Sequence, residues 1–150
     1  MSWYPHVTVA TIVEHNGKFL MVEERDTDGN QVFNQPAGHL ERDETLVECA
    51  VRETLEETGW RVQPIAFLNV RLYQSPQNNV TYVRTNIVAT AIEQIADAVI
   101  DPDIIAVHWF TEQQLTHDAI TLRSPLVMQA IKDFRNETHY PLTVINAHPI

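Results

Sequence analysis

Short runs of apolar residues, separated by turn-forming clusters, predict β-strands in the first quarter of the chain. Residues 7–13 (VTVATIV) are β-branched and partly alternating, and residues 18–22 (KFLMV) follow the turn-forming cluster His15-Asn16-Gly17. We therefore expect these two runs to pair as a hairpin. A second turn at 26–30 leads to a short strand around Val32 and Phe33 and then to a loop at 35–38.

A helix is the most clearly marked element of the chain. Residues 45–58 contain no glycine or proline and are rich in helix formers. Thr45 and Glu48 have the spacing of a capping box, and Gly59 stands where a glycine cap ends many helices. The pattern therefore predicts a helix that begins within a residue or two of Thr45 and stops before Gly59.

The middle of the chain returns to strands. Runs rich in β-formers at 62–73 and 80–92 flank the turn-forming residues 75–79, which predicts a long antiparallel hairpin. A further strand is expected at 104–110.

Two helices are expected near the C-terminus, a short one at 111–115 and a longer one at 124–134 with Pro125 in its first turn. The residues after 147 form a tail that is expected to be loose. Strands, helix, strands and helices in this order predict an α+β fold. No repeat, linker or low-complexity tract interrupts the chain, so we expect residues 1–150 to form one domain.

Composition and net charge limit the kinds of ligand and partner that the protein is expected to bind. The chain has 150 residues, 44% of them hydrophobic and 20% charged, which is typical of a folded domain. Its net charge of −10 argues against binding to nucleic acid or to an anionic membrane, so any polyanionic ligand needs a mediating cation. The single cysteine, Cys49, fits a reducing compartment, and no targeting segment or membrane span is apparent. We expect a cytoplasmic protein.

Several common catalytic motifs are absent from the sequence. The four glycines are too far apart for a dinucleotide fingerprint or a phosphate-binding loop of the Walker type. No histidine pair has the spacing of a helical zinc site, and none of the three serines lies in a nucleophile elbow. Residues 26–30 resemble the start of a calcium loop, but Gln31 replaces its glycine and Ala37 its bidentate acid, so a simple turn is expected.

The predicted helix carries an unusual concentration of acids. At about 100° per residue, Glu53, Glu56 and Glu57 fall on one face, and like charges at this spacing repel one another. A mostly apolar stripe occupies the opposite face: Val47, Ala50, Val51, Thr54, Leu55 and Thr58. Two interpretations remain open from the pattern alone. The acids either form a solvated face softened by Arg52 pairing with Glu48 and Glu56, or they hold a hard divalent cation.

The spacing of these residues resembles the signature of the Nudix hydrolase superfamily, G-x5-E-x7-R-E-U-x-E-E-x-G-U, where U is a bulky apolar residue. Eight of its nine defined positions are matched across residues 38–60, by Gly38, Glu44, Arg52, Glu53, Glu56, Glu57, Gly59 and Trp60. The departure is Thr54, which replaces an aliphatic residue on the packing face. We expect this exchange to alter packing slightly and to leave the chemistry intact.

The resemblance continues outside the signature. Residues 5–10 (PHVTVA), 33–41 (FNQPAGHLE) and 122–127 (LRSPLV) are similar to the NudJ-type phosphatases of the superfamily, so that the likeness covers about residues 5–145. It implies an α/β/α sandwich with a mixed central sheet. It also implies hydrolysis of nucleoside tri- and diphosphates, and of hydroxymethylpyrimidine pyrophosphate, by water attack on phosphorus.

The resemblance assigns roles to individual residues. Glu53, Glu56, Glu57 and the backbone carbonyl of Ala37 would bind Mg²⁺ or Mn²⁺. Arg52 and Glu44 would orient the carboxylates. The general base stays open: Glu53 is the first choice, and the remaining candidates are Glu56, Glu93, Asp101 and Asp103.

The sequence constrains the residues that contact the substrate less than it constrains the metal-binding residues. Arg84 and Arg123 are candidates for phosphate binding, unless they form surface salt bridges, and Gln35 and His39 are candidates by their position beside the signature. Three aromatic residues, Trp3, Phe33 and Tyr73, are candidates for stacking on a base, unless they belong to the core. The expected partner is a small phosphorylated molecule, and the chain is expected to act as a monomer or homodimer.

Three functional classes compete at this point. The first is a metal-dependent phosphohydrolase, of the NudJ type or of another Nudix subclass that cleaves nucleotide sugars, dinucleoside polyphosphates or oxidised nucleotides. The second is a ligand-sensing Nudix domain without catalysis, and the third is an acidic protein-interaction domain. The complete acidic set favours the first class.

Overall fold

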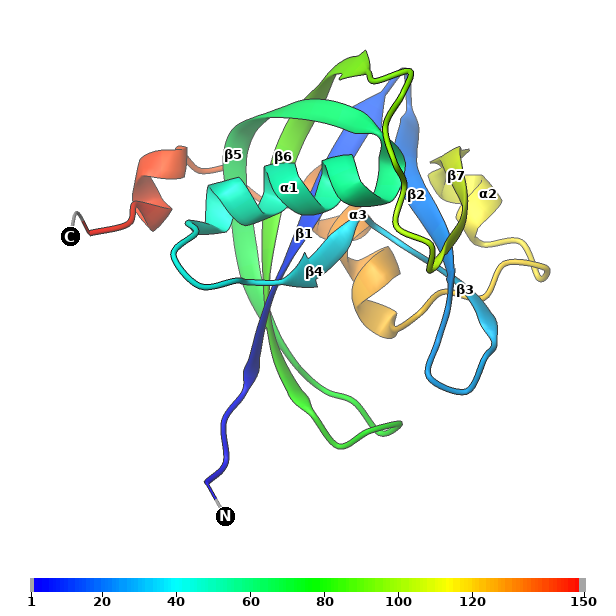
Figure 1. Cartoon of the computed structure of the whole chain (residues 1–150), viewed down its shortest axis with the longest axis horizontal. Helices are drawn as coiled ribbons and strands as arrows, with labels where there is room; N and C mark the ends of the chain where they lie inside the picture. The colour runs from blue at the N-terminus through cyan, green and yellow to red at the C-terminus, as the bar shows by residue number, and fades with distance from the viewer. Residues whose placement is uncertain (1, 149–150) are drawn as a thin grey trace.

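Strand β1 (His6–His15) lies at the centre of a seven-stranded mixed sheet in the computed structural model, which describes residues 2–148 (Figure 1). Residues 7–13 of this strand are almost all apolar or β-branched, as expected for a strand covered on both faces. The order of the main strands is β3-β2-β1-β6-β5, with β4 beside β1 and β7 beside β2.

Of the six strand pairs within residues 2–148, three join strands that are consecutive in the chain and three join distant strands. Strand β1 runs parallel to β6 and antiparallel to β2 and β4, and β5 and β6 form the long antiparallel hairpin. The bounds of these strands are β2 (Lys18–Arg25), β3 (Gln31–Asn34), β4 (Ala37–His39), β5 (Trp60–Gln74), β6 (Thr81–Gln94) and β7 (Ile104–Thr111).

Helix α1 (Leu46–Thr58) crosses one face of the sheet, in front of it in Figure 1. Thr45 accepts a hydrogen bond from the N–H of Glu48, whose carboxylate accepts one from the N–H of Thr45, so the expected capping box is confirmed. Gly59 ends the helix in the left-handed conformation, with φ of 75°. Under the helix, Val9 and Ile87 pack against Cys49 and Ala50.

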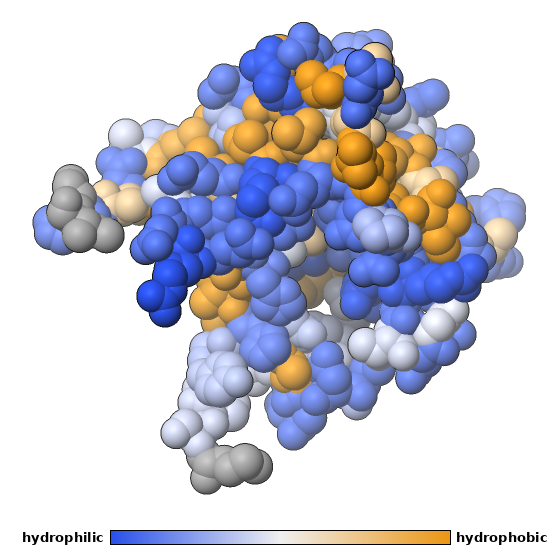
Figure 2. All heavy atoms as spheres, in the orientation of Figure 1, coloured by the Kyte–Doolittle hydropathy of each residue, from blue (hydrophilic) through white to orange (hydrophobic). Residues whose placement is uncertain are grey.

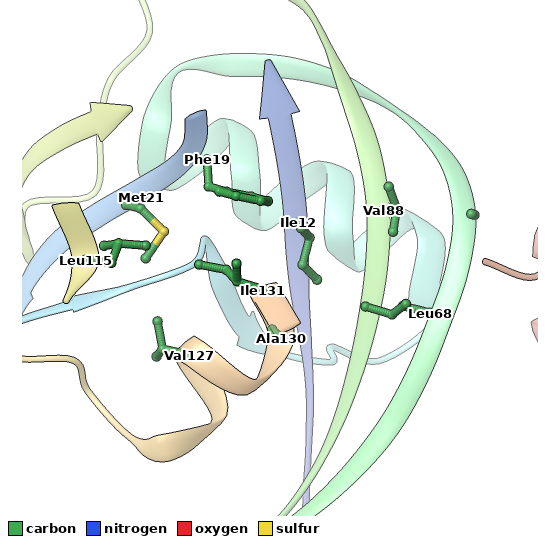
Figure 3. Close-up of a cluster of buried hydrophobic side chains, with 10 residues drawn as sticks. Ile12, Phe19, Met21, Leu68, Val88, Leu115, Val127, Ala130 and Ile131 are labelled. Carbon is green, nitrogen blue, oxygen red and sulfur yellow. The ribbon is translucent and has the colours of Figure 1, made fainter. Parts of the chain in front are cut away.

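Helix α3 (Pro125–Asn136) covers the opposite face, together with the short helix α2 (Glu112–Leu115). Figure 3 shows side chains of α3 packed against β1, β2 and β6. This cluster contains the following buried residues: Ile12, Phe19, Met21, Ala66, Leu68, Val88, Leu115, Val127, Ala130 and Ile131. The two covered faces confirm an α+β sandwich with a mixed sheet.

Most of the expected elements are confirmed, with two differences. The stretch 35–38 is not entirely a loop, because residues 37–39 form strand β4 and pair with β1. A 3₁₀ helix, η1 (Leu142–Ile145), follows α3 and was not expected from the sequence. Of the expected loose tail, residues 147 and 148 have no regular structure and residues 149–150 lie outside the described part of the chain.

No helix within residues 2–148 is long and apolar enough to cross a membrane. Figure 2 shows a largely hydrophilic surface over α1 and a hollow below it, between the lower part of the β5–β6 hairpin and the β2–β3 hairpin. The acidic residues of α1 and this hollow are neighbours through strand β4, which packs on α1 on one side and pairs with β1 on the other.

Candidate active site

Strand β4 brings the backbone of Ala37 and Gly38 against the acidic residues of α1. The N–H of Ala37 donates a hydrogen bond of 2.8 Å to the Glu57 carboxylate. A Cβ placed on Gly38 would lie only 2.0 Å from the carboxyl carbon of Glu53. Glycine is therefore required at position 38 for Glu53 to stay where it is.

Glu57 is the most buried of the three acids, with 7% of its surface exposed. Burial raises the pKa of Glu57 to about 9, and the hydrogen bond from Ala37 offsets only part of that rise. Within residues 2–148, no arginine, lysine or histidine forms an ion pair with Glu57. The interpretation of the acids as a solvated face is therefore wrong for Glu57.

Helix α1 is rotated slightly from the expected orientation. The residues buried in it are Cys49, Ala50, Thr54, Glu57 and Thr58. Val47, Val51 and Leu55 of the expected apolar stripe are only half-buried. The rotation moves Glu57 toward the sheet and leaves Glu56 exposed, so the three acids span the boundary between core and solvent.

Arg52 holds the carboxylates of this region in a network. Its guanidinium donates to Glu44 at 2.7 and 2.9 Å, to Glu53 at 2.8 Å and to Glu56 at 3.2 Å, and to the carbonyl of His39. Hydrogen bonds from Arg52 lower the pKa of Glu44 to about 2. The expected pair with Glu48 is replaced by the capping box, in which Glu48 accepts from the backbone of Thr45.

Within residues 2–148, no three acidic, histidine or cysteine side chains already converge as a metal centre. Arg52 lies between Glu53 and Glu56 and neutralises both. The donor chemistry still fits a hard divalent cation, because three carboxylates and a peptide carbonyl at Ala37 supply only oxygen atoms. The buried, uncompensated carboxylate of Glu57 beside the side-chain-free Gly38 supports the same fit.

Thr54, the departure from the Nudix signature, is fully buried between α1 and β1. Its hydroxyl shares a hydrogen bond of 2.9 Å with that of Thr11 and donates to the carbonyl of Ala50 at 2.7 Å. Thr11 supplies a polar partner on the sheet, so the hydroxyl that replaces an aliphatic side chain is not left unpaired.

A cavity of about 300 Å³ lies on the other side of β4. It is lined by Thr8, Glu24, Asn34, Ala37, Gly38, His39, Tyr73, Ser75, Pro76, Gln77, Asn78, Tyr82, Arg84, Arg123, Ser124 and Leu126. The carbonyl-bearing backbone of Ala37 and Gly38 is thus a wall shared by the cavity and the acidic helix.

Arg84 is the most buried charged residue of the cavity wall, with 6% exposed. Its guanidinium donates to the amide oxygens of Gln35 at 2.6 Å and Asn34 at 3.3 Å. No carboxylate within residues 2–148 lies within ion-pairing distance of it. Burial lowers the pKa of Arg84 to about 10, which keeps the group charged at neutral pH. The alternative of a surface salt bridge is therefore wrong for Arg84.

Arg123 lies near Arg84 in the same wall. It donates to Glu24 at 2.8 Å, and Glu24 also accepts from Asn34, the amide that contacts Arg84. Arg123 is partly exposed and ion-paired, so the salt-bridge alternative describes part of its environment. The amides and Glu24 fix both cations at the cavity without fully neutralising Arg84.

The other candidates for substrate contact occupy different positions. His39 and Tyr73 line the cavity, and burial and the neighbouring His6 lower the pKa of His39. Gln35 does not line it: the side chain is 1% exposed and links Arg84 to the carbonyl of Val127 at 2.8 Å. Gln35 therefore positions Arg84 and does not face the cavity.

Two aromatic candidates lie outside the cavity. Phe33 is buried against His108 and Phe110, so the core alternative is correct for it. Trp3 is 73% exposed and does not line the cavity.

The other candidates for the general base lie in different parts of the structure. Glu93 pairs with Arg61 on the surface at the far end of β6 and does not line the cavity. Asp101 donates its backbone N–H to the carbonyl of Glu56 and lies at the end of α1. Asp103 lines a separate surface depression beside Arg123.

The sequence reasoning missed several cavity residues, among them Tyr82, Asn34 and Glu24. Tyr82 and Arg84 are two apart in a strand and so point to the same face, which is a signal present in the sequence. Asn34 and Glu24 depend on the pairing of β2 with β3, which no local pattern specifies.

The chain is similar in sequence to known proteins. The family model described as the NUDIX domain matches residues 4–130. The phosphatase NudJ of Escherichia coli strain K12 is 43% identical over 142 residues, covering 94% of this chain and 90% of that protein, and the phosphatase NudJ of Shigella flexneri gives the same values.

The fold is shared with solved structures. A NUDIX hydrolase from Nitrosomonas europaea superposes with a TM-score of 0.92 and 33% identity, covering 97% of this chain and 98% of that one. A UDP-X diphosphatase superposes with a TM-score of 0.72 at 16% identity, covering 92% of this chain and 66% of that one. This second likeness concerns the fold alone. The signature on α1, the fold and the relatives agree, and the chain belongs to the NUDIX family of hydrolases.

Proposed function

We propose that this Nudix hydrolase is a Mg²⁺-dependent phosphatase that cleaves a phosphoanhydride bond of nucleoside tri- and diphosphates, with hydroxymethylpyrimidine pyrophosphate as a further substrate. The observation that carries the proposal is the cavity itself. One wall has Arg84, a buried cation that forms no ion pair with a carboxylate in the described part of the chain, and another has the Ala37–Gly38 backbone, backed by the acids of α1. The curated relatives named NudJ are called phosphatases, which supports the same activity.

Glu53, Glu56, Glu57 and the carbonyl of Ala37 are the residues proposed to hold the cation, with Mn²⁺ as an alternative to Mg²⁺. A divalent ion bound there supplies positive charge to the phosphates and acidifies the attacking water. Arg52 holds the carboxylates of Glu53 and Glu56 in place, and Glu44 in turn fixes Arg52 through two hydrogen bonds.

Glu53 remains the proposed general base. Its side chain is largely buried and lies against Gly38, at the backbone wall of the cavity. Burial raises the pKa of Glu53 above its ordinary value, and the hydrogen bond from Arg52 offsets only part of that rise. A carboxylate whose pKa is raised in this way is suited to accept the proton of the attacking water. Glu56 is the alternative on the same helix, whereas the positions of Glu93 and Asp103 make them weaker candidates.

Arg84 and Arg123 are proposed to bind the phosphate oxygens. A guanidinium offers two parallel N–H donors to a phosphate, and burial strengthens that attraction. Glu24 and Asn34 hold the two arginines in fixed positions, and Gln35 acts on Arg84 from behind. In a protein of net charge −10, these two residues give the cavity a local positive charge that an anionic substrate needs.

Glu57→Gln tests the metal role. The substitution keeps the size of the side chain and removes its charge, so phosphate release should fall by about 100-fold or more, with the thermal unfolding temperature retained. Initial rates of orthophosphate release from nucleoside tri- and diphosphates, with and without Mg²⁺, provide the measurement.

Glu48→Gln is the matched control, because Glu48 is exposed on the same helix and glutamine also completes a capping box. Its activity should equal that of the wild type. Full activity of Glu57→Gln, or of the wild type in excess chelator, would contradict the proposal.

A substrate panel distinguishes the proposal from its alternatives. It contains nucleoside tri- and diphosphates, dinucleoside polyphosphates, nucleotide sugars and hydroxymethylpyrimidine pyrophosphate, and orthophosphate and pyrophosphate are measured separately. Predominant orthophosphate supports the NudJ-type activity, whereas pyrophosphate from triphosphates, or cleavage of nucleotide sugars alone, indicates another Nudix subclass. Binding without any turnover indicates a ligand-sensing domain.

Two further features stay proposals. We propose a cytoplasmic location, for which the free cysteine Cys49 is the supporting observation. The active form is proposed to be a monomer or a homodimer, which sedimentation equilibrium distinguishes.

A further inference from the structure

We infer that the end of the cavity formed by Tyr73, Tyr82 and the hairpin loop at 75–79 binds the heteroaromatic ring of the substrate, with its phosphates extending along the strands toward β4. The inference rests on the proposed function and adds to it the orientation of the substrate. It is based on the register of the sheet, which aligns residues of neighbouring strands side by side in rows, and on the chemistry of the residues in each row.

The sheet arranges the cavity residues in rows. In the first row, Ala37 on β4 pairs with Ala10 on β1. In the second row, His39, Thr8 and Arg84 are paired across β4, β1 and β6. In the third row, Tyr82 pairs with His6 on one side and with Tyr73 on the other.

Successive rows on one face are two residues apart, which is about 6–7 Å along a strand. The backbone of Ala37, where the cation is proposed, and the aromatic row are therefore about 13 Å apart. Arg84 lies midway between them. An extended molecule that places a phosphate at the first row and another at Arg84 has its organic part at Tyr82 and Tyr73.

The third row has the composition of a ring-binding site. Arg84 and Arg123 are the only arginine or lysine residues in the cavity lining; Arg84 belongs to the second row, and Arg123 is paired with Glu24 of β2. The end instead offers two phenol rings, the ring of Pro76 and the amides of Gln77 and Asn78. Aromatic faces and neutral amides suit an uncharged heterocycle better than a phosphate.

Tyr82 is held as a fixed platform. Its ring and that of His6 form a T-shaped pair with a centroid distance of 5.8 Å, and its hydroxyl accepts a hydrogen bond of 2.9 Å from the amide of Asn78. The loop is also tied across the cavity rim, because Gln77 donates to Asp28 in the β2–β3 turn at 2.8 Å. A ring bound here meets a surface that is already ordered, which limits the entropic cost of binding.

Tyr82→Leu tests the inference. Loss of one stacking partner should raise KM for ATP by about tenfold, while the inhibition constant of inorganic tripolyphosphate, which has no ring, stays unchanged. Tyr82→Phe keeps the ring and loses only the hydroxyl that accepts from Asn78, so KM for ATP should rise far less than in Tyr82→Leu. Tyr140→Leu, a similar exchange on a tyrosine that does not line the cavity, should leave both constants unchanged.

Calorimetric binding of adenosine monophosphate, which involves no turnover, separates this inference from the proposed function. If Tyr82→Leu weakens that binding about tenfold but the wild type releases no phosphate, the inference stands and the proposed function fails. If the wild type is active and Tyr82→Leu affects ATP and tripolyphosphate equally, or neither, the inference is overturned and the function stands. Tyr73→Leu repeats the test if Tyr82→Leu does not fold.

Discussion

Gly38 shows how a single missing side chain can shape a site. Its backbone conformation is one that any residue can adopt, so its value lies in the space beside Glu53 and not in a special φ angle. The carboxyl group of Glu53 fills the position that a Cβ would take. The glycine of the signature is therefore explained by contact between β4 and α1.

Gly38→Ala is predicted to separate activity from stability. The added methyl must displace the end of the flexible Glu53 side chain, so the free energy of unfolding should change by about 1 kcal/mol or less. Because Glu53 is the proposed general base, a displacement of its carboxylate by about 1 Å should lower kcat about 100-fold. Denaturant unfolding and phosphate release measure the two effects, and a variant with unchanged kcat would contradict this account of Gly38.

The identities and spacing of the residues are enough to recognise the signature. They do not predict the surroundings of each signature residue in the fold. The spacing of Glu53, Glu56 and Glu57 predicts a shared face, but the burial of Glu57 depends on where β4 crosses the helix. Similarly, Arg84 could be placed on a strand from its neighbours. Its amide surroundings come from Asn34 and Gln35, about fifty residues earlier in the chain.

At the scale of elements, local signals predicted the boundaries and the two hairpins β1–β2 and β5–β6, but not the pairings between strands that are distant in the chain. Helix α1 lies between its capping box and Gly59 as expected, because caps are local hydrogen bonds. Strand β4 was missed since a three-residue strand carries no periodicity of its own and exists only by pairing with β1. The 3₁₀ helix η1 was missed for a similar reason, because its apolar residues pack against a distant cluster.

The contact between α1 and β1 supplies a prediction at this scale. Thr54→Val and Thr11→Val should each lower the free energy of unfolding by about 0.5–1.5 kcal/mol, because each removes one partner of a buried hydroxyl pair. The double variant should lose less than the sum of the two, since the hydrogen bond between the hydroxyls is lost in each single variant and can be lost only once in the double variant. Strict additivity in a double-mutant cycle would show that the two hydroxyls do not cooperate.

At the scale of the whole molecule, Asp133 joins the hairpin to the helix on the far face of the sheet. This buried carboxylate on α3 accepts hydrogen bonds from Arg71 and Asn69 on β5 and from Gln129 on its own helix. Burial acts to raise the pKa of Asp133, but the bonds from Arg71, Gln129 and Asn69 outweigh it and hold the pKa below its ordinary value.

This contact predicts a dependence of stability on pH. A lowered pKa in the folded state stabilises the protein above the unfolded pKa of about 4, and the contribution is lost as the pH falls through the folded value. Asp133→Asn should cost about 1–3 kcal/mol at pH 7 and should remove this part of the acid destabilisation. Asp97→Asn, on an exposed loop, is the control. Parallel pH profiles for wild type and Asp133→Asn would contradict the prediction.

The rows that cross the cavity have a last consequence for which molecules the enzyme can process. A hydrogen-bonded sheet does not stretch, so the separation between the Ala37 row and the Tyr82 row is constant. The cavity therefore keeps its two ends at a fixed separation, which is set by the spacing of alternate residues along the strands. With the ring placed at the Tyr82 row, as inferred above, the number of phosphates decides how far the chain reaches toward Ala37, so nucleoside tri- and diphosphates are expected to be cleaved at different rates.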